Sequence, residues 1–128
     1  MRVLFVDDEP LNRTVVADML ETSGIETSEA SDAADGLRMI DAEQFDVVLM
    51  DLRMPGMDGL AAIQTIRSRT DGRSCLPVVL VTADTSSDLF ERAKAAGADR
   101  LVLKPVDMTV LFDAMAQAMS DRGALVLS

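Results

Sequence analysis

The chain has 128 residues, 48% of them hydrophobic and 27% charged, which is typical of one globular domain. Its formal net charge of −10 excludes an electrostatic surface for nucleic acid or for an anionic membrane. Histidine is absent, which excludes histidine-based catalysis and a phosphohistidine on this chain, and the single cysteine excludes an internal disulfide.

The first part of the chain predicts two strands separated by a helix. Residues 3–6 (VLFV) predict a buried strand, and a segment of helical periodicity then runs from Pro10 to a stop at Gly24. The residues of this helix that are expected to face the core are Leu11, Val15 and Met19. Residues 25–30 (IETSEA) predict a weak, polar strand that suits the edge of a sheet.

The middle of the chain repeats this pattern with a more apolar strand. A second helix is expected to start at Ser31 or Asp32, and it directs Leu37 and Ile40 inward. Residues 47–50 (VVLM) predict a strand that is buried on both faces, followed by the loop DLRMPGMDG. The helix after this loop has its core-facing residues at Leu60, Ile63 and Ile66.

The last part of the chain predicts two more strands, each followed by a helix. Residues 78–82 (VVLVT) form the fourth predicted strand, and a helix is expected from about Ser86 to Ala96 with a stop at Gly97. Residues 101–103 (LVL) form the fifth strand. The last helix has its core positions at Leu111, Met115 and Met119.

Regular alternation of strands and helices predicts an α/β fold with a parallel sheet that is covered on both faces. The polar second strand belongs at an edge, which favours the flavodoxin-like, doubly wound (βα)5 arrangement with strand order 2-1-3-4-5. We expect one domain over residues 1–122 and a short tail, GALVLS, over 123–128. The apolar tail leaves two interpretations open, docking on the domain or docking on a second subunit of a homodimer.

Five polar residues come at the carboxyl ends of the predicted strands, and they are Asp7, Asp8, Asp51, Thr82 and Lys104. In this fold the carboxyl ends of the strands meet at one edge, so the five side chains are expected to surround one pocket. Clustered carboxylates without histidine suit Mg²⁺, whose charge would offset the repulsion between Asp7 and Asp8. Asp51 could then act as a nucleophile toward phosphorus, while Lys104 and Thr82 contact the phosphoryl oxygens.

Each of these residues also has an ordinary structural explanation. An Asp-Asp pair is usually a solvated turn or a helix cap, a Lys-Pro pair often only ends a strand, and threonine is common at strand ends. The joint placement of such residues after strands 1, 3, 4 and 5 is what favours the functional interpretation.

The motifs FVDDEP, LMDLRMPGMDG, VTAD and LVLKPV together resemble the response-regulator receiver domain, the phosphoacceptor module of two-component signalling. The resemblance covers essentially the whole chain. It implies that Asp51 is the phosphoacceptor, and that Mg²⁺, with Mn²⁺ as a substitute, is bound by Asp7, Asp8, Asp51 and the backbone carbonyl of Arg53. It also implies that Thr82 senses the phosphoryl group together with Lys104, and that the Lys104–Pro105 peptide bond is cis.

One residue departs from the family pattern. The family usually has an aromatic residue three positions before the lysine, and here that residue is Leu101. We therefore expect switching to run through Thr82 and the loop Ala83–Ser87, without a rotating ring. Arg53 and Asp84 occupy variable positions at the mouth of the family's site, where they either tune the lifetime of the phosphoryl group or simply pair with each other.

The sequence thus predicts a phosphorylation-activated switch, and not an enzyme with a separate substrate, although the domain is expected to promote its own phosphorylation and autodephosphorylation. The phosphodonor is expected to be a histidine kinase, a histidine phosphotransfer protein or a small molecule such as acetyl phosphate. Repacking of the fourth strand, the helix after it, the fifth strand and the last helix would control partner binding. Two alternatives are a Mg²⁺-dependent phosphatase with an aspartyl-phosphate intermediate and a receiver-like binding module that works without phosphorylation.

The surroundings of the domain are less constrained by the sequence. No apolar stretch approaches the roughly 20 residues that span a bilayer, and residues 1–6 are too short for a signal peptide, so we expect a cytoplasmic protein. The chain is expected to be either a stand-alone receiver or a piece of a hybrid kinase. The segment DDEPLNR, with Asn12 four residues after Asp8, slightly favours the hybrid kinase.

Overall fold

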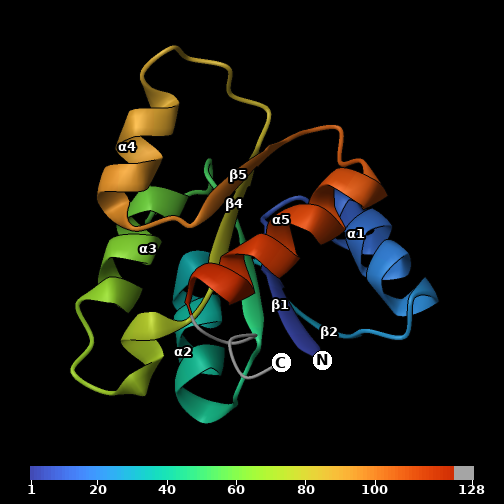
Figure 1. Cartoon of the computed structure of the whole chain (residues 1–128), viewed down its shortest axis with the longest axis horizontal. Coiled ribbons are helices and arrows are strands. Elements are labelled where there is room, and N and C mark those ends of the chain that lie inside the picture. Colours follow the sequence, from blue (N-terminus) through green and yellow to red (C-terminus); the bar gives the residue numbers. More distant parts are fainter. Residues whose placement is uncertain (123–128) are drawn as a thin grey trace.

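The computed structural model describes residues 1–122, which form a five-stranded parallel sheet with helices on both faces (Figure 1). The strands are β1 (Arg2–Val6), β2 (Glu26–Ala30), β3 (Val47–Asp51), β4 (Val78–Thr82) and β5 (Arg100–Leu103). The helices are α1 (Pro10–Thr22), α2 (Ala33–Ala42), α3 (Gly59–Arg67), the short 3₁₀ helix η1 (Gly72–Cys75), α4 (Leu89–Ala96) and α5 (Met108–Asp121). The predicted tail at 123–128 lies outside the described residues.

The strand order is β2-β1-β3-β4-β5, and every neighbouring pair is parallel. This order confirms the predicted flavodoxin-like fold, with the polar strand β2 at an edge. The order reverses between β1 and β3, because β2 lies on one side of β1 and the later strands β3, β4 and β5 follow on its other side. In open parallel sheets of this kind, ligands bind at the carboxyl ends of the two strands between which the order reverses.

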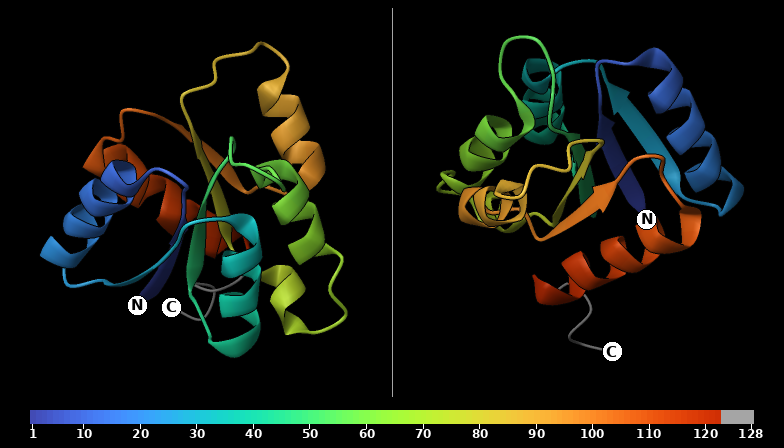
Figure 2. Two further views of the ribbon diagram at one scale, coloured as in Figure 1. Left: turned by 180° about the vertical axis from the view of Figure 1, so that it is seen from behind. Right: turned by 90° about the horizontal axis from the view of Figure 1, so that it is seen from above.

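Helices α1 and α5 cover one face of the sheet, and α2, α3 and α4 cover the other (Figure 2). Alternate residues of β1 supply the two cores: Leu4 and Val6 pack on the face of α2 and α3, while Val3 and Phe5 pack under α1 and α5. From Val3 in β1, and throughout β3 and β4, the strands are buried on both sides and continuously apolar until they reach the carboxyl edge. After Arg2, the next polar side chains along these strands therefore appear at that edge.

The buried face of α1 differs from the one predicted from its sequence. Val16, Ala17 and Leu20 are buried, whereas Leu11 and Val15 are exposed by 68% and 44% of their surface. Helix α1 carries two neighbouring apolar stripes, and periodicity alone does not tell which of them faces the sheet. The stripe that contains the small Ala17 packs on the sheet, so the prediction for Leu11 and Val15 was wrong.

The predicted helix boundaries mostly agree with the structure, and the differences have local causes. Of the two candidates for the start of α2, Asp32 is the cap, because its carboxylate accepts a hydrogen bond from the Asp35 amide at 2.7 Å. Helix α4 begins at Leu89 instead of Ser86, since the Asp84 carboxylate accepts the Ser86 amide and holds it in a turn. The helix η1 was not predicted. None of the helices in residues 1–122 is long and apolar enough to cross a membrane.

Candidate functional site

The five polar residues that follow the strands lie around one cavity at the carboxyl edge of the sheet. Asp7 and Asp8 come directly after β1, Asp51 and Thr82 are the last residues of β3 and β4, and Lys104 follows β5. The open cavity has a volume of about 420 Å³ and is lined by Asp7, Asp8, Glu9, Asn12, Asp51, Arg53, Thr82, Ala83, Asp84 and Lys104. The structure therefore brings together all the side chains that the sequence analysis selected at the strand ends.

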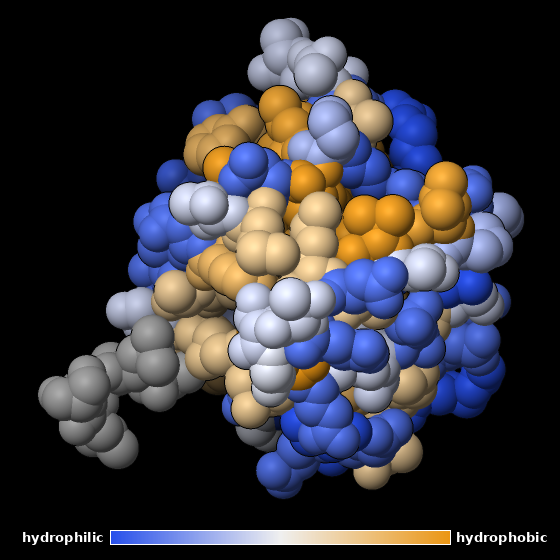
Figure 3. All heavy atoms as spheres, turned by 90° about the vertical axis from the view of Figure 1, so that its right-hand side faces the viewer, coloured by the Kyte–Doolittle hydropathy of each residue, from blue (hydrophilic) through white to orange (hydrophobic). Residues whose placement is uncertain are grey.

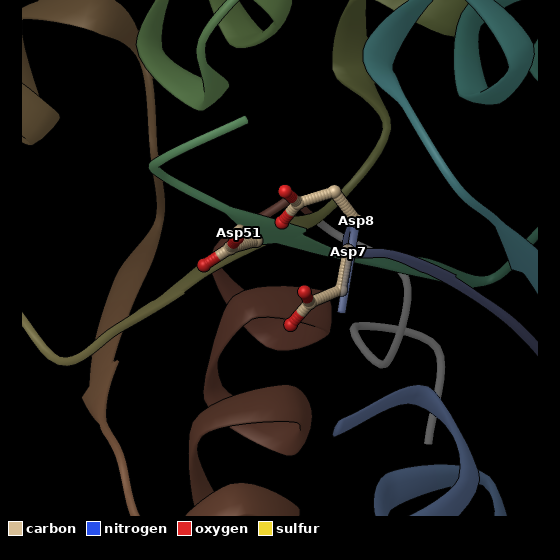
Figure 4. Close-up of side chains that lie close together, drawn as sticks. All are labelled: Asp7, Asp8 and Asp51. Carbon is tan, nitrogen blue, oxygen red and sulfur yellow. The ribbon is translucent and has the colours of Figure 1, made fainter. Parts of the chain in front are cut away.

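Three carboxylates converge in this cavity. Asp7, Asp8 and Asp51 each offer an oxygen within 4.8 Å of the others, and Figure 4 shows the three groups directed into a common space. Asp7 is fully buried and Asp51 is 5% exposed, while Asp8 reaches solvent. At an effective dielectric near 20, two unit charges about 4 Å apart repel by roughly 4 kcal/mol. Such a cluster of hard oxygen ligands fits a divalent cation such as Mg²⁺.

Lys104 supplies positive charge to the cavity. Its Nζ donates hydrogen bonds to Asp7 Oδ2 and to Asp51 Oδ1, both at 3.0 Å. Burial by itself would lower the pKa of Lys104, but these two hydrogen bonds raise it overall. Burial raises the pKa of Asp51, an effect that Lys104 opposes and that the charges of Asp7 and Asp8 reinforce. Lys104 thus pairs with two of the three carboxylates, and negative charge remains in excess.

Asp51 is held in place by the start of helix α3. The Gly59 amide donates to the Leu52 carbonyl oxygen at 2.8 Å, which ties the first residue of α3 to the end of β3. A Cβ atom on Gly59 would lie 2.9 Å from the Asp51 carbonyl carbon and 3.0 Å from Leu52 Cα, so only glycine fits there. The sequence analysis missed this residue. The Asp-Gly pair that ends the DLRMPGMDG segment was the available signal, because Asp58 caps α3.

Thr82 and its neighbours form the wall of the cavity opposite β1. The Thr82 side chain is buried, and its hydroxyl oxygen accepts a hydrogen bond from the Asp84 amide at 3.1 Å. The Thr82 carbonyl oxygen accepts the Lys104 amide at 2.8 Å, and the following Lys104–Pro105 peptide bond is cis, as the family resemblance implied. Leu101 is partly buried and packs against the core on the α4 side of the sheet.

Arg53 and Asp84 form an ion pair at the cavity mouth. Of the two interpretations that the sequence left open, pairing is therefore confirmed, and an effect on the phosphoryl group stays a prediction. The Arg53 side chain is 77% exposed, whereas that of Asp84 is only 6% exposed. Hydrogen bonds from the Ser86 hydroxyl and amide, together with Arg53, lower the pKa of Asp84 to about 2.

Comparison with known proteins agrees with this geometry. The family model described as the response regulator receiver domain matches residues 3–116. The sensor histidine kinase RcsC of Salmonella typhimurium is 38% identical over 116 residues, which are 91% of this chain but 12% of that protein. The transcriptional regulatory protein PdtaR of Mycobacterium tuberculosis is 37% identical over 120 residues, 93% of this chain and 57% of that protein. The chain thus spans only part of these relatives.

Solved structures share the same fold. The chemotaxis protein CheY4 of Vibrio cholerae superposes with a TM-score of 0.85 and 28% identity, covering 91% of this chain and 97% of that one. The receiver domain of the sensor histidine kinase PA1611 of Pseudomonas aeruginosa has a TM-score of 0.84 and 27% identity, covering 93% and 97% of the two chains. That structure is described with a magnesium ion coordinated in its active-site cleft.

Proposed function

The chain belongs to the response regulator receiver domain family of two-component signalling, and from this premise we propose that it is a switch controlled by phosphorylation of Asp51. The observation that carries the proposal is the convergence of three strand-end carboxylates with Lys104 and Thr82 in one cavity. The phosphodonor is a phosphohistidine of a histidine kinase or of a histidine phosphotransfer protein, and it lies outside these 128 residues, which contain no histidine.

A magnesium site supports this chemistry. Asp7, Asp8 and Asp51 would hold the ion together with the backbone carbonyl of Arg53, which lies two residues beyond the acceptor. When bound, Mg²⁺ or its substitute Mn²⁺ supplies positive charge that offsets the carboxylates and neutralises the oxygens of the phosphoryl group. The excess of carboxylates over the single ammonium group in the cavity favours such a ligand.

In the transfer step, a carboxylate oxygen of Asp51 attacks phosphorus, the new O–P bond forms, and the N–P bond to the donor imidazole breaks. The electron pair of the N–P bond stays on the ring nitrogen, which takes up a proton from solvent so that the donor leaves as neutral imidazole. Lys104 turns from Asp51 toward one phosphoryl oxygen, and the Thr82 hydroxyl donates to another. Water that attacks the aspartyl phosphate reverses the state, so the domain also promotes its own dephosphorylation without acting on a separate substrate.

Phosphorylation then biases the region around β4, α4, β5 and α5. The added group carries roughly −1.5 to −2 charges at pH 7, and it draws Thr82 away from the Asp84 amide that its hydroxyl now accepts. The loop Ala83–Ser87 follows Thr82, while Leu101 offers no aromatic ring to rotate. Moving a 1:99 equilibrium to 99:1 needs about 5.5 kcal/mol of differential stabilisation, which new bonds from Thr82 and Lys104 to the phosphoryl group would supply.

The donor protein docks beside the cavity on helix α1. Leu11 and Val15 are exposed, and they lie on the helix that begins three residues after Asp7. Figure 3 views the side of the molecule that carries α1 and shows apolar patches within a mostly polar surface. Such patches commonly mark protein interaction sites. The downstream partner, dimer formation, the predicted cytoplasmic location and membership of a hybrid kinase stay predictions.

The proposal is tested by incubating the protein with Mg²⁺ and acetyl phosphate and measuring the intact mass. We expect the gain of one phosphoryl group, its loss in Asp51→Asn, and its retention in Asp58→Asn, a matched control in which the replaced aspartate caps α3. Failure of the unmodified protein to gain mass, with beryllofluoride also failing to bind, would refute the proposal and favour a binding module without phosphorylation. Repeated turnover of a chromogenic phosphate ester would instead favour the phosphatase.

A further inference from the structure

Asp8 is the least constrained of the three carboxylates in the cavity. Asp7 and Asp51 are buried and accept hydrogen bonds from Lys104, but Asp8 is exposed. Within residues 1–122, its carboxylate accepts no hydrogen bond from the protein. The position of this group therefore depends on the backbone that carries it, above all on the peptide bond between Asp7 and Asp8.

Arg13 of α1 reaches back to that peptide bond. Its Nη1 donates to the Asp7 carbonyl oxygen at 2.7 Å, across six residues of sequence. The Arg13 side chain is only 18% exposed, and its Nε lies 3.5 Å from Glu29 Oε1 on the edge strand β2. Hydrogen bonds that involve a charged donor are stronger and more directional than neutral ones. The guanidinium is thus held by Glu29 on one side and fixes the Asp7 carbonyl on the other.

Strand β2 holds the preceding peptide bond, between Val6 and Asp7. The Asp7 amide donates to the carbonyl oxygen of Ala30 at 3.1 Å, directly after Val6, the residue of β1 that pairs with Ala30. The Asp7 carboxylate accepts the Glu9 amide at 2.8 Å, which sets the turn into α1. Arg13 therefore completes a set of contacts in which every polar group of the Asp7 backbone is bound.

We propose that Arg13 is a positioning residue for cation binding, one that orients Asp8 through the Asp7 carbonyl without touching the cation. The inference rests on the proposed function, because it concerns the same magnesium site. The direction in which removal of Arg13 changes the cation affinity distinguishes positioning from a simple electrostatic effect. Removing a positive charge close to a cation site should tighten cation binding, whereas loss of a group that orients the ligands weakens metal binding by about 10- to 100-fold.

Calorimetric titration of the full chain with MgCl₂ tests the proposal. We expect Arg13→Ala to weaken Mg²⁺ binding about tenfold, and Arg13→Lys to weaken it less, because a lysine donates as a point charge and cannot bridge Glu29 and the carbonyl as a guanidinium does. The control is Arg38→Ala. Arg38 lines the same groove as Arg13, but it is 71% exposed and pairs with Asp35 on its own helix. We expect that variant to bind like the unmodified protein.

A second measurement shows whether Arg13 acts through Asp8. In an Asp8→Ala background, the further loss caused by Arg13→Ala should largely disappear, because coupled residues are not additive. Without any metal, Arg13→Ala should also move the carbonyl ¹³C resonance of Asp7, while Arg38→Ala should not.

The outcomes separate this inference from the proposed function. If the unmodified protein binds no Mg²⁺, the proposed function fails. If the unmodified protein binds Mg²⁺ but Arg13→Ala binds it equally well or more tightly, or loses affinity equally with and without Asp8, the role of Arg13 is overturned. Should Arg13→Ala fail to fold by circular dichroism, Arg13→Lys and Glu29→Gln decide by the same criteria.

Discussion

The two ends of the sheet differ in the balance of positive and negative side chains. At the amino ends of β4 and β5, the buried carboxylate of Asp99 accepts hydrogen bonds from Arg67 at 3.0 Å, from Arg122 at 2.8 Å and from the Val78 amide at 2.9 Å. At the carboxyl ends, Lys104 pairs with Asp7 and Asp51, and Asp8 lies beside them without an ion-pair partner in the described residues. Two cations thus surround the one carboxylate of Asp99, whereas a single ammonium group stands among the three carboxylates of Asp7, Asp8 and Asp51.

Arg67 makes further hydrogen bonds at this edge. Arg67 donates to the carbonyl oxygens of Ser74, Leu76 and Gly97, so its guanidinium joins α3, η1 and the end of α4. Buried polar groups that are completely satisfied make a region rigid, whereas partly satisfied ones are available for a ligand. The comparison suggests that the amino edge stabilises the fold, and that the excess of negative charge at the carboxyl edge fits the cation site of the proposed function.

The largest expected effect is at the amino edge. Asp99→Ala removes a buried carboxylate from the guanidiniums of Arg67 and Arg122, whose side chains are 14% and 27% exposed. Breaking a buried ion pair by removing one partner costs about 3–5 kcal/mol. We expect urea unfolding, followed by circular dichroism, to show this loss, while the folded fraction still binds Mg²⁺ like the unmodified protein. Asp121→Ala is the control, because Asp121 pairs with Arg100 at the surface, and it should change stability by about 0.5 kcal/mol or less. Equal losses in both variants would contradict the comparison.

The next effect has the opposite sign and lies at the carboxyl edge. Asp8→Asn removes one of three repelling charges, so in the presence of a chelator it should stabilise the protein by roughly 1 kcal/mol, the scale of interactions between partly exposed charges. In the presence of Mg²⁺ the unmodified protein should instead be the more stable of the two. At a concentration of 100 Kd, the unmodified protein gains about 2.7 kcal/mol from ligand binding, and Asp8→Asn should gain far less. Thermal unfolding with and without Mg²⁺ measures both stability differences. If Asp8→Asn is less stable than the unmodified protein in chelator, repulsion among the three carboxylates is not what limits stability there.

The two edges also differ in how far the sequence predicts them. Asp7, Asp51 and Lys104 each come directly after a run of apolar residues, so each marks a strand end in a local pattern, and parallel strand order then places them together. Arg67 and Asp99 carry no such local mark. Their meeting depends on how α3 packs beside η1 and β5, which is tertiary information that periodicity does not contain.

Helices were predicted well where only one apolar stripe was available. Leu60, Ile63 and Ile66 of α3 are buried as expected. In α1 two stripes compete, and the one that contains Val16, Ala17 and Leu20 is buried. Gly59 was missed for a related reason, since a backbone that approaches another backbone closely leaves no apolar pattern in the sequence.

A smaller effect tests whether the carboxyl edge is also where the donor protein docks. Leu11→Ser combined with Val15→Ser removes apolar surface beside the cavity, and we expect phosphotransfer from a phosphohistidine protein to slow about tenfold, which is a change of roughly 1.4 kcal/mol. Phosphorylation by acetyl phosphate should keep its rate, because a small donor does not need this surface. The control is Phe90→Ser, an exposed apolar residue on α4. Equal slowing with both donors would mean that the double variant disturbs the cavity instead of docking.

The smallest expected effect is a pH dependence that only the carboxyl edge should show. The pKa of Lys104 is raised above its ordinary value of 10.5, mainly by the hydrogen bonds to Asp7 and Asp51 that outweigh burial. Its contribution to the free energy of unfolding is therefore fully present below that ordinary value, and it is lost as the pH rises through the folded-state pKa. Because Lys104 is partly exposed to solvent, the loss should be about 1 kcal/mol or less.

Few other side chains interfere with this measurement, since the sequence has no tyrosine and its only other lysine is Lys94. Urea unfolding at pH 9 and pH 11 should show a larger drop for the unmodified protein and for Lys94→Arg than for Lys104→Met. The arginine–carboxylate contacts of the amino edge keep their charges over this range, so Asp99→Ala should leave the size of the drop unchanged. A drop of equal size in Lys104→Met would assign the alkaline loss to groups outside the cavity and would remove the distinction between the two edges.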